Sequence, residues 1–421
     1  MRVETGTHRL ALAVAARSAT VPDAIDLSSE GMEPSHEASP RPDVFFGFSY
    51  EMFDDAVGRE FCRPPDQTLL ALAHDSRIGR LMVADPWRSY VVSAARRRPV
   101  RLIEDISVAG RDAIRVRPHR LRTDDASDIG TVERSYRRYG EVLGRALARS
   151  RGEREPAPDS AALVTYHPFA AAFCDSAWIS RIVYFGQDDW ATGEGVAKWW
   201  DVYREAYRRI DRRCAAIFAV SEELADRLSP RTEVVPNGVI ADVWRPRRPA
   251  ADRIASLPRP RVVYTGTIDD RLDRALVEST ASMVGSVVMI GYPGDTQTIE
   301  WLRSLDRVHV FDPVGQDELA AMVQACDVGM IPHRDDPCIR AMSPLKLYEY
   351  LAAGLPVLSV DLPPVHGVDD ERVRICRRED WAKSLTQVLG MGSATEQHRQ
   401  AFIDAVSWER RMRPVVDAAV G

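Results

Sequence analysis

Short runs of β-forming residues alternate with helix-like segments through the second half of the chain, and this alternation restricts the fold more than any other feature. Six such runs occur, at residues 261–265, 286–290, 307–311, 328–331, 356–360 and 372–376. Helix-like segments lie between them, for example at 317–325 and 344–353. Parallel strands need a crossover connection, because a tight turn joins only antiparallel ones. The second half is therefore predicted to form a doubly wound parallel sheet.

The first half shows a similar but less regular alternation. Strand-like runs lie at 44–48, 80–84, 162–166, 181–185 and 216–220, separated by polar or helical stretches. Residues 96–154 are so rich in charge and arginine that strands are hard to place there. The pattern predicts a second α/β unit.

Prolines mark the boundary between the two halves. Residues 244–260 contain Pro246, Pro249, Pro258 and Pro260, a composition typical of a linker. The predicted organisation is a flexible leader (1–42), an N-terminal Rossmann-like domain (43–243), the linker (244–260), a C-terminal Rossmann-like domain (261–395) and a C-terminal helical segment (396–421).

Composition and charge narrow the classes of function. Hydrophobic residues make up 45% of the 421 residues, enough for two cores, and the net charge of −6 argues against nucleic acid as the main partner. The six cysteines form no C-x-x-C pair and no zinc spacing, so we expect no metal site. No run approaches the ~18 apolar residues of a transmembrane helix. A cytoplasmic protein is expected.

A helix with strong boundary signals lies at residues 343–354. Ser343 is expected to cap its first turn, Pro344 to occupy the first helical position and Gly354 to end it. Because the helix follows the strand-like run 328–331, its N-terminus is expected at the carboxyl edge of the sheet. Open α/β sheets bind ligands at that edge.

Lys346 lies in the first turn of this helix, where a cation opposes the helix dipole. An anion bound at the helix end would reverse the sign, since backbone amides and the lysine would then converge on it. Glu349 lies one turn further along, on the same face. A surface pair between Lys346 and Glu349 is the alternative.

Residues 343–354, continued by Pro356-Val357-Leu358, resemble the donor-site helix of retaining GT-B glycosyltransferases of family four. Other segments resemble the family's motifs in the same order, namely 219–224 with 235–239, 264–273, 326–332 and 406–411. Residues 63–67, 85–88 and 184–190 are similar to transferases of cell-surface polysaccharide assembly, including the teichuronic-acid type. The resemblance implies an α/β protein of the GT-B fold, with two Rossmann-like domains facing a central cleft.

The resemblance also implies an activity and a donor site. The activity is transfer of a hexosyl group from a nucleoside-diphosphate sugar, with retention and without a metal or other cofactor. Lys346 and Arg271 would hold the diphosphate, and the carboxylate of Glu349 would accept hydrogen bonds from the ribose hydroxyls. Further substrate contacts are implied for Gly266, Thr267, Ser343 and Leu345. Arg271 as an ordinary loop arginine stays an alternative.

The N-terminal domain is expected to bind the acceptor, a glycan or a lipid-linked molecule. Gly47 follows the first strand and is a candidate for close approach to the donor phosphate, with a plain turn glycine as the alternative. His167 and Asp188 follow later strands and are candidate catalytic residues, although a lone histidine is more often structural. Trp199 and Trp200 are interpreted as packing residues.

Arg96-Arg97-Arg98 leaves peripheral contact with anionic lipid open, the alternative being a solvated face. Two positions depart from the family pattern: Ala341 stands where its first glutamate would be, and Asp312 where it usually has glycine. Two other functions stay open, a sugar-nucleotide epimerase and a non-catalytic transferase-like partner protein. A dehydrogenase is disfavoured because Thr265 to Asp270 supplies no G-x-G-x-x-G.

Overall fold

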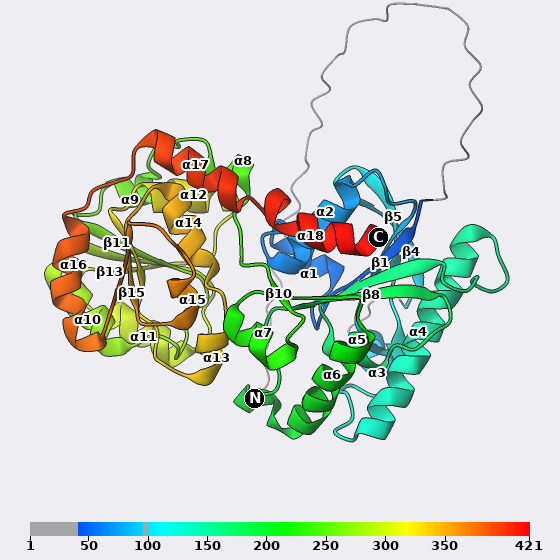
Figure 1. Cartoon of the computed structure of the whole chain (residues 1–421). Coiled ribbons are helices and arrows are strands. Elements are labelled where there is room, and N and C mark those ends of the chain that lie inside the picture. Colours follow the sequence, from blue (N-terminus) through cyan, green and yellow to red (C-terminus); the bar gives the residue numbers. More distant parts are fainter. Residues whose placement is uncertain (1–40, 96–99) are drawn as a thin grey trace, which may run out of the picture. The chain divides into compact units, whose positions relative to one another are not determined.

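The computed structural model describes residues 41–95 and 100–421 (Figure 1). All but the last two residues of the predicted leader, and all of Arg96-Arg97-Arg98, lie outside the described residues. Two mainly parallel sheets organise the described chain, one formed by residues 43–234 and one by residues 261–376. We call the parts built on them the N-lobe and the C-lobe.

The N-lobe sheet has eight strands in the order β10-β9-β8-β7-β1-β2-β5-β4. Their bounds are β1 (Asp43–Gly47), β2 (Leu81–Ala84), β4 (Ile103–Val108), β5 (Arg111–Val116), β7 (Ala161–Thr165), β8 (Ile179–Gly186), β9 (Ala216–Ala219) and β10 (Glu233–Val234). All neighbours pair in parallel except β4 and β5. This hairpin lies in the arginine-rich stretch where the sequence assigned no strand. Asp105, Ser107 and Asp112 of the hairpin are exposed, so it lacks the apolar run of a buried strand.

Helices and a two-stranded ribbon complete the N-lobe. The helices are α1 (Phe53–Gly58), α2 (Pro64–His74), α3 (Tyr90–Ala95), α4 (Ile129–Arg151), α5 (Pro168–Phe173), η1 (Glu194–Trp199), α6 (Trp200–Arg213) and α7 (Glu222–Leu228). The ribbon pairs β3 (Arg88–Ser89) with β6 (His119–Arg120). The longest helix, α4, begins at the cap Asp128 and ends at left-handed Gly152. Both signals are ordinary helix boundaries.

The C-lobe sheet has six parallel strands in the order β13-β12-β11-β14-β15-β16. They are β11 (Arg261–Thr265), β12 (Ser286–Ile290), β13 (Val308–Phe311), β14 (Val328–Ile331), β15 (Val357–Val360) and β16 (Val373–Cys376). These are the six strands expected from the sequence, and the predicted α/β fold class is confirmed. The strand order reverses direction between β11 and β14, which makes their carboxyl ends the switch point where such sheets bind ligands.

Helices cover both faces of this sheet, α12 and α14 on one and α10 and α16 on the other (Figure 1). The C-lobe helices are α10 (Arg274–Met283), α11 (Thr296–Ser304), α12 (Gln316–Gln324), α13 (Pro337–Ala341), α14 (Leu345–Ala353), α15 (Pro363–His366), η2 (Arg378–Asp380) and α16 (Trp381–Leu389).

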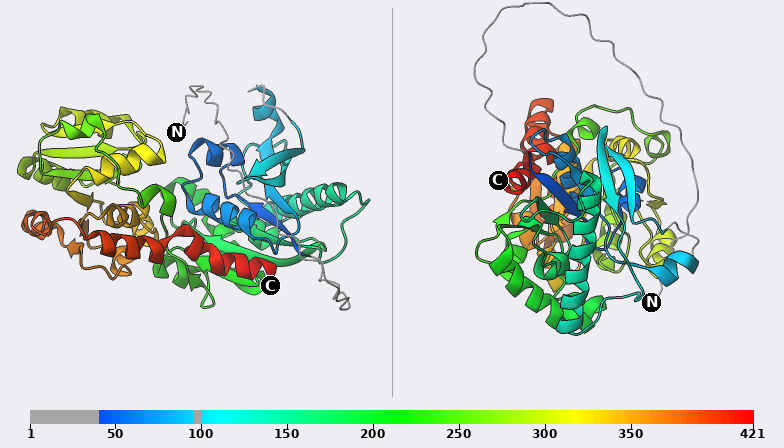
Figure 2. Two further views of the ribbon diagram at one scale, coloured as in Figure 1. Left: turned by 90° about the horizontal axis from the view of Figure 1, so that it is seen from above. Right: turned by 90° about the vertical axis from the view of Figure 1, so that its right-hand side faces the viewer.

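Two crossings join the lobes. The first contains α8 (Ala241–Trp244) and α9 (Asp252–Ala255), and the second consists of α17 (Glu396–Val406) and α18 (Trp408–Val420). Figure 2 shows α18 lying along the N-lobe, where Met412 and Val415 are fully buried in its core. The crossings meet at Gly238, since a Cβ there would lie 2.6 Å from the carbonyl oxygen of Val406. Only glycine permits this approach.

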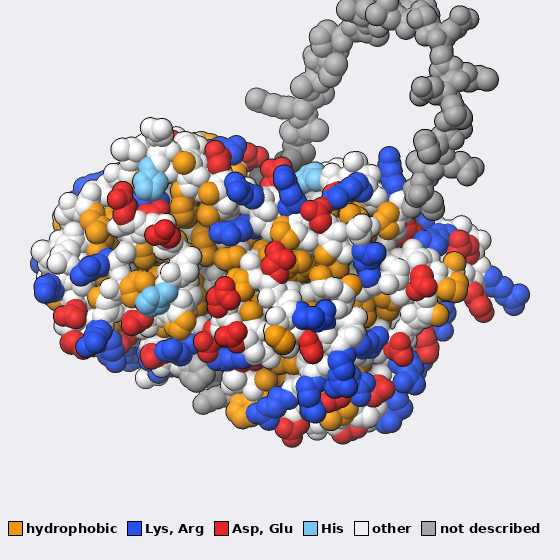
Figure 3. Space-filling model, viewed as in Figure 1, with side chains coloured by type: hydrophobic (Ala, Val, Ile, Leu, Met, Phe, Trp, Pro, Cys, Tyr) orange, Lys and Arg blue, Asp and Glu red, His pale blue; other side chains and the backbone are white. Residues whose placement is uncertain are grey.

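The surface shown in Figure 3 carries Lys and Arg side chains interspersed with Asp and Glu, with no field of a single sign. Among the described residues, none of the helices combines the length and apolar character that a bilayer crossing requires.

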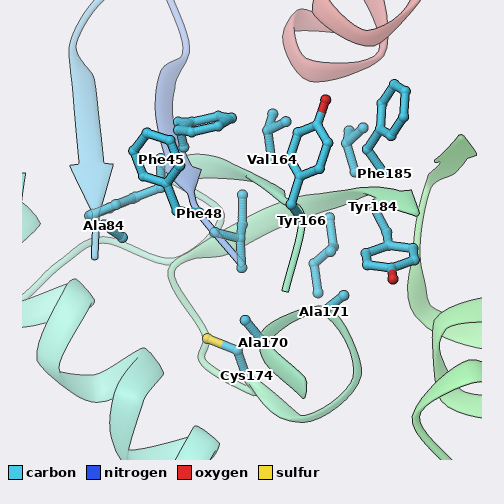
Figure 4. Packing of buried hydrophobic residues seen from close by; sticks show 14 of the residues in the cluster. Phe45, Phe48, Ala84, Val164, Tyr166, Ala170, Ala171, Cys174, Tyr184 and Phe185 are labelled. Carbon is cyan, nitrogen blue, oxygen red and sulfur yellow. The ribbon is translucent and has the colours of Figure 1, made fainter. Parts of the chain in front are cut away.

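The N-lobe core fills both faces of its sheet (Figure 4). Tyr166 and Phe185 stack with ring centroids 4.9 Å apart, on the face covered by α18. Tyr184 lies on the opposite face with Ala170 and Ala171 of α5, because successive side chains of a strand alternate between faces. The core thereby fixes the carboxyl ends of β7 and β8.

Candidate functional site

Lys346 lies at the switch point of the C-lobe sheet, in the first turn of α14. Its Nζ is 3.7 Å from the centroid of the Tyr264 ring, at the end of β11, and 3.4 Å from Nε2 of His333, which follows β14. Gly266, with φ +115°, lies on a third side of this ammonium group, where a Cβ would be 3.4 Å from Nζ. Residues at the carboxyl ends of β11 and β14 thus surround the ammonium group of Lys346.

The start of α14 differs from the sequence prediction. The helix begins at Leu345, and Pro344 is its N-cap residue with extended dihedral angles and no side-chain hydrogen bond. The prediction that Ser343 caps the helix was wrong. The carbonyl oxygen of Ser343 instead accepts a 2.7 Å hydrogen bond from Nδ2 of Asn237, so the chain turns into the helix one residue later.

Lys346 and Arg271 lie near two carboxylates, those of Glu349 and Asp269. Burial lowers the pKa of Lys346, and the nearby Arg271 lowers it further, while Glu349 and Asp269 oppose the shift. Burial also lowers the pKa of His333, with Lys346 and Arg271 acting in the same direction, so this imidazole is neutral. A neutral ring that accepts from the lysine at Nε2 carries its proton on Nδ1. An anion placed beside these cations would be stabilised.

Glu349 lies one turn along α14 and is buried. Its Oε2 is 3.5 Å from the hydroxyl of Thr265. Burial raises the pKa of Glu349 to about 7, and Lys346 and Thr265 act against this shift. The carboxyl therefore titrates near neutral pH, and in its ionised form it can accept hydrogen bonds from ligand hydroxyl groups.

Arg271 lies in the loop after β11 and forms an ion pair with Asp269 of the same loop at 2.8 Å. Its charge reaches Lys346 and His333, as their pKa shifts show. Thr267, in the same loop, accepts a hydrogen bond from the Tyr264 hydroxyl through its carbonyl oxygen. The structure therefore places Gly266, Arg271 and Glu349 around Lys346. Of the other C-lobe candidates, Ser343 and Leu345 contact the N-lobe.

Two N-lobe residues hold the loop before α14. The hydroxyl of Ser221 donates a 2.7 Å hydrogen bond to the carbonyl oxygen of Ala341, and Asn237 holds Ser343. Leu345 packs against the N-lobe core. Both polar residues belong to the segments 219–224 and 235–239, which thus contact the candidate site from the other lobe. Ala341 itself is buried and contributes only its backbone.

The N-lobe candidates lie at the carboxyl edge of their own sheet. Asp188 follows β8 with an exposed side chain. Partial desolvation raises its pKa to about 6; Glu51 adds to the shift, and Arg63 and Arg271 oppose it. This influence of Arg271 connects Asp188 with the C-lobe site. Gly47 ends β1, and a Cβ there would lie 3.0 Å from the Thr165 hydroxyl, a tight contact between β1 and β7.

His167 is a buried structural cap in this arrangement. Its Nδ1 accepts from the backbone N–H of Phe169 at the start of α5, and its Nε2 lies 2.9 Å from the Tyr136 hydroxyl. Burial lowers its pKa to about 4. The neutral ring therefore carries its proton on Nε2 and donates it to Tyr136, which donates in turn to Asp125 at 3.2 Å.

Sequence reasoning missed His333 and Tyr264. The signal for His333 was its position two residues beyond the buried strand β14, at the edge where ligands bind. Tyr264 reads as an ordinary core residue of β11, and only the fold places its ring under Lys346. Asp312, which departs from the family pattern, lines a separate cavity of about 230 Å³ beside Gly291.

Residues 259–390 match the family described as glycosyl transferases group 1. This part of the chain is a glycosyltransferase group 1 domain. It contains the whole C-lobe sheet and every C-lobe residue of the candidate site.

A putative teichuronic acid biosynthesis glycosyltransferase, TuaH of Bacillus subtilis (strain 168), is 28% identical over 176 residues. The match covers 38% of this chain and 44% of that protein, so it spans less than half of either. It agrees with the resemblance to polysaccharide-assembly transferases inferred from the sequence.

Solved structures show the fold of the glycosyltransferase group 1 domain together with the N-lobe. Sucrose-phosphate synthase from Thermosynechococcus elongatus has a TM-score of 0.60 at 14% identity, covering 89% of this chain and 97% of its own. Trehalose-6-phosphate synthase from E. coli, bound with UDP-2-fluoro glucose, has a TM-score of 0.59 at 11% identity, covering 89% and 98%. The predicted GT-B fold is confirmed.

Proposed function

We propose that this protein is a retaining glycosyltransferase that moves a hexosyl group from a nucleoside-diphosphate sugar to a glycan or lipid-linked acceptor, without a metal or other cofactor. The glycosyltransferase group 1 domain and the match to TuaH support the reaction class. Retention, metal independence and the acceptor are parts of the proposal that rest on the site.

The observation that carries the proposal is the position of Lys346. Its ammonium group lies in the first turn of a helix whose N-cap provides no side-chain acceptor, and Arg271 adds a second positive charge nearby. A diphosphate fits this combination, since helix amides and cations both favour an anion. Glu349, one turn along, is in place for hydroxyl groups of the nucleotide ribose.

In the proposed reaction, an acceptor hydroxyl oxygen bonds to the anomeric carbon of the donor sugar on the face that the diphosphate leaves. The bond between that carbon and the diphosphate oxygen breaks, and its electron pair goes to the diphosphate. The hydroxyl proton passes to a departing phosphate oxygen. Lys346 and Arg271 stabilise the charge that develops on the leaving group, which is the main electrostatic contribution such a site offers.

A thermal-shift panel with UDP, GDP, dTDP, ADP and NAD tests the donor site. A nucleotide present at 100 times its dissociation constant adds about 2.7 kcal/mol of apparent stability. One nucleoside diphosphate is expected to stabilise the wild type but not Lys346→Ala. Lys383→Ala, an exposed lysine of α16, is the matched control and should keep the full shift. Stabilisation by NAD alone, or by no nucleotide, contradicts the donor site.

Turnover and its stereochemistry test the rest of the proposal. With the donor sugar found by screening sugars carried on that nucleotide, NMR of the product should show the anomeric configuration of the donor, and activity should persist with EDTA. Binding without turnover would favour the non-catalytic alternative, which the buried Ala341 keeps open because it supplies no carboxylate. Isomerisation of the nucleotide sugar without an acceptor would favour an epimerase.

We also propose that the protein contacts a membrane peripherally, from the cytoplasmic side. Tyr90, Val91 and Val92 of α3 are exposed apolar residues, as is Leu121, which follows β6. The neighbouring Ser89 donates a hydrogen bond to the carbonyl oxygen of Leu121, so these residues lie close together. Cosedimentation with vesicles of phosphatidylglycerol and phosphatidylcholine should fall in the double variant Val91→Ser, Leu121→Ser. Unchanged cosedimentation contradicts this contact.

A further inference from the structure

A cavity of about 370 Å³ lies at the carboxyl edge of the N-lobe sheet, in the lobe that lacks the nucleotide-site residues. Tyr50 follows β1, Trp87 follows β2, His167 follows β7 and Trp190 follows β8, and all four line it. Carboxyl ends of parallel strands meet at one edge of a sheet, where α/β folds bind ligands. The cavity is therefore a position for a small molecule.

Aromatic rings form much of its wall. The Tyr50 ring lies 4.7 Å from that of Trp190, and Trp190 stacks with Tyr203 at 6.0 Å. Trp199, at the end of η1, also lines the cavity and is held by a 3.1 Å hydrogen bond from its Nε1 to the carbonyl oxygen of Asp125. The negative face of an aromatic ring attracts the weakly positive C–H groups of a sugar ring.

Polar side chains stand among these rings. The hydroxyl groups of Tyr50 and Tyr203 share a 2.7 Å hydrogen bond, and Thr123 also lines the cavity. Hydroxyl groups both donate and accept hydrogen bonds, as the hydroxyl groups of a sugar do. The cavity thus combines ring faces with hydrogen-bonding groups, the two features that bind a carbohydrate.

The charges that line the cavity balance. Arg120 forms an ion pair with Asp125, and Arg88 and Asp124 carry one charge of each sign. His167 adds none, because burial lowers its pKa to about 4. A ligand with a phosphate or carboxylate group gains little from such a lining.

We infer that this cavity is a binding subsite for one neutral pyranose ring of the acceptor. The assignment rests on the proposed glycosyltransferase function for the role of the sugar, but the cavity and its lining are independent of the nucleotide site around Lys346.

Saturation-transfer NMR tests the subsite with methyl glucoside, methyl galactoside and methyl mannoside as neutral probes, and methyl glucuronide and glucose 6-phosphate as anionic ones. At least one neutral glycoside should bind the wild type. Trp199→Leu and Tyr50→Ala should each bind it about tenfold more weakly, the loss of one aromatic contact. Trp200→Leu is the matched control, because the adjacent Trp200 does not line the cavity, and it should bind as the wild type does.

Binding of none of the neutral glycosides, binding of the anionic probes alone, or equal losses in Trp199→Leu and Trp200→Leu would each overturn the inference. The nucleotide thermal shift separates this failure from failure of the proposed function. Trp199→Leu should keep that shift, which also shows that the variant is folded. Glycoside binding in a protein that binds no nucleoside diphosphate would leave the subsite standing and remove the proposed function.

Discussion

The protonation of Glu349 makes the candidate donor site sensitive to pH. It is buried beside Thr265 and Lys346, and its carboxyl pKa is about 7. The pKa of a glutamate in the unfolded chain is about 4.3. Between these two values the folded protein holds more protons than the unfolded chain, so this residue lowers stability as the pH rises toward 7. The same shift leaves an ionised acceptor available above pH 7.

Glu349→Gln should therefore change the pH dependence of stability. The neutral amide resembles the protonated acid, so near pH 4 to 5 the two proteins should be similar in stability. By pH 8 the variant should be more stable than the wild type, by at most about 4 kcal/mol. Urea unfolding of both proteins at pH 5 and pH 8 measures this difference. Glu371→Gln, at an exposed position, is the control, and an equal difference at both pH values contradicts the prediction.

At the scale of elements, the start of α14 depends on the other lobe. Asn237 and Ser221 donate hydrogen bonds to the backbone carbonyl oxygens on either side of Met342. A second contact between the lobes lies at the start of α12, where Glu60 accepts a 2.9 Å hydrogen bond from the backbone N–H of Gln316. The position of Lys346 is consequently set by contacts between lobes as well as by its own helix.

Asn237→Ala should weaken both folding and nucleotide binding. It leaves the Ser343 carbonyl without its donor, which costs about 1–3 kcal/mol of unfolding free energy at a buried site. Lys346, three residues further along, should lose its fixed position, and the thermal shift by the nucleoside diphosphate should shrink. Ser282→Ala, which removes an exposed hydroxyl of the C-lobe, is the control. A full nucleotide shift in Asn237→Ala would show that the contact does not position the helix.

At the scale of the whole molecule, the last helix belongs to the core of the first lobe. Met412 of α18 is fully buried, and its sulfur accepts a 2.9 Å hydrogen bond from the Thr68 hydroxyl of α2. Helix α18 therefore completes the core of the N-lobe. The stability of this lobe thus depends on residues that are distant from it in the sequence.

Met412→Ala should lower the free energy of unfolding by about 2–5 kcal/mol, because it removes a buried side chain and leaves a cavity. Met391→Ala, at a side chain that is 47% exposed, should change it little. Urea unfolding gives the two values, and hydrogen exchange should show faster opening of α2 only in Met412→Ala. Equal effects of the two substitutions contradict the packing described for α18.

The sequence determined the features that depend on neighbours along the chain. Apolar periodicity located the six C-lobe strands, and Lys346 stood out because its charge opposes the helix end where it lies. The exposed hairpin β4–β5 lacked such a pattern, and the expected cap Ser343 was displaced because Asn237 bonds its carbonyl oxygen. The local sequence indicates where an element forms. It does not indicate a contact from another lobe that competes with the expected cap.

The tertiary structure decided everything that requires segments far apart in the chain to meet. Tyr264 and His333 surround Lys346 only because β11 and β14 are neighbours in the sheet. The aromatic cavity draws its rings from four strand ends and from helices, and only the fold brings these segments together. Such contacts are set by the packing of whole elements, which local periodicity does not encode.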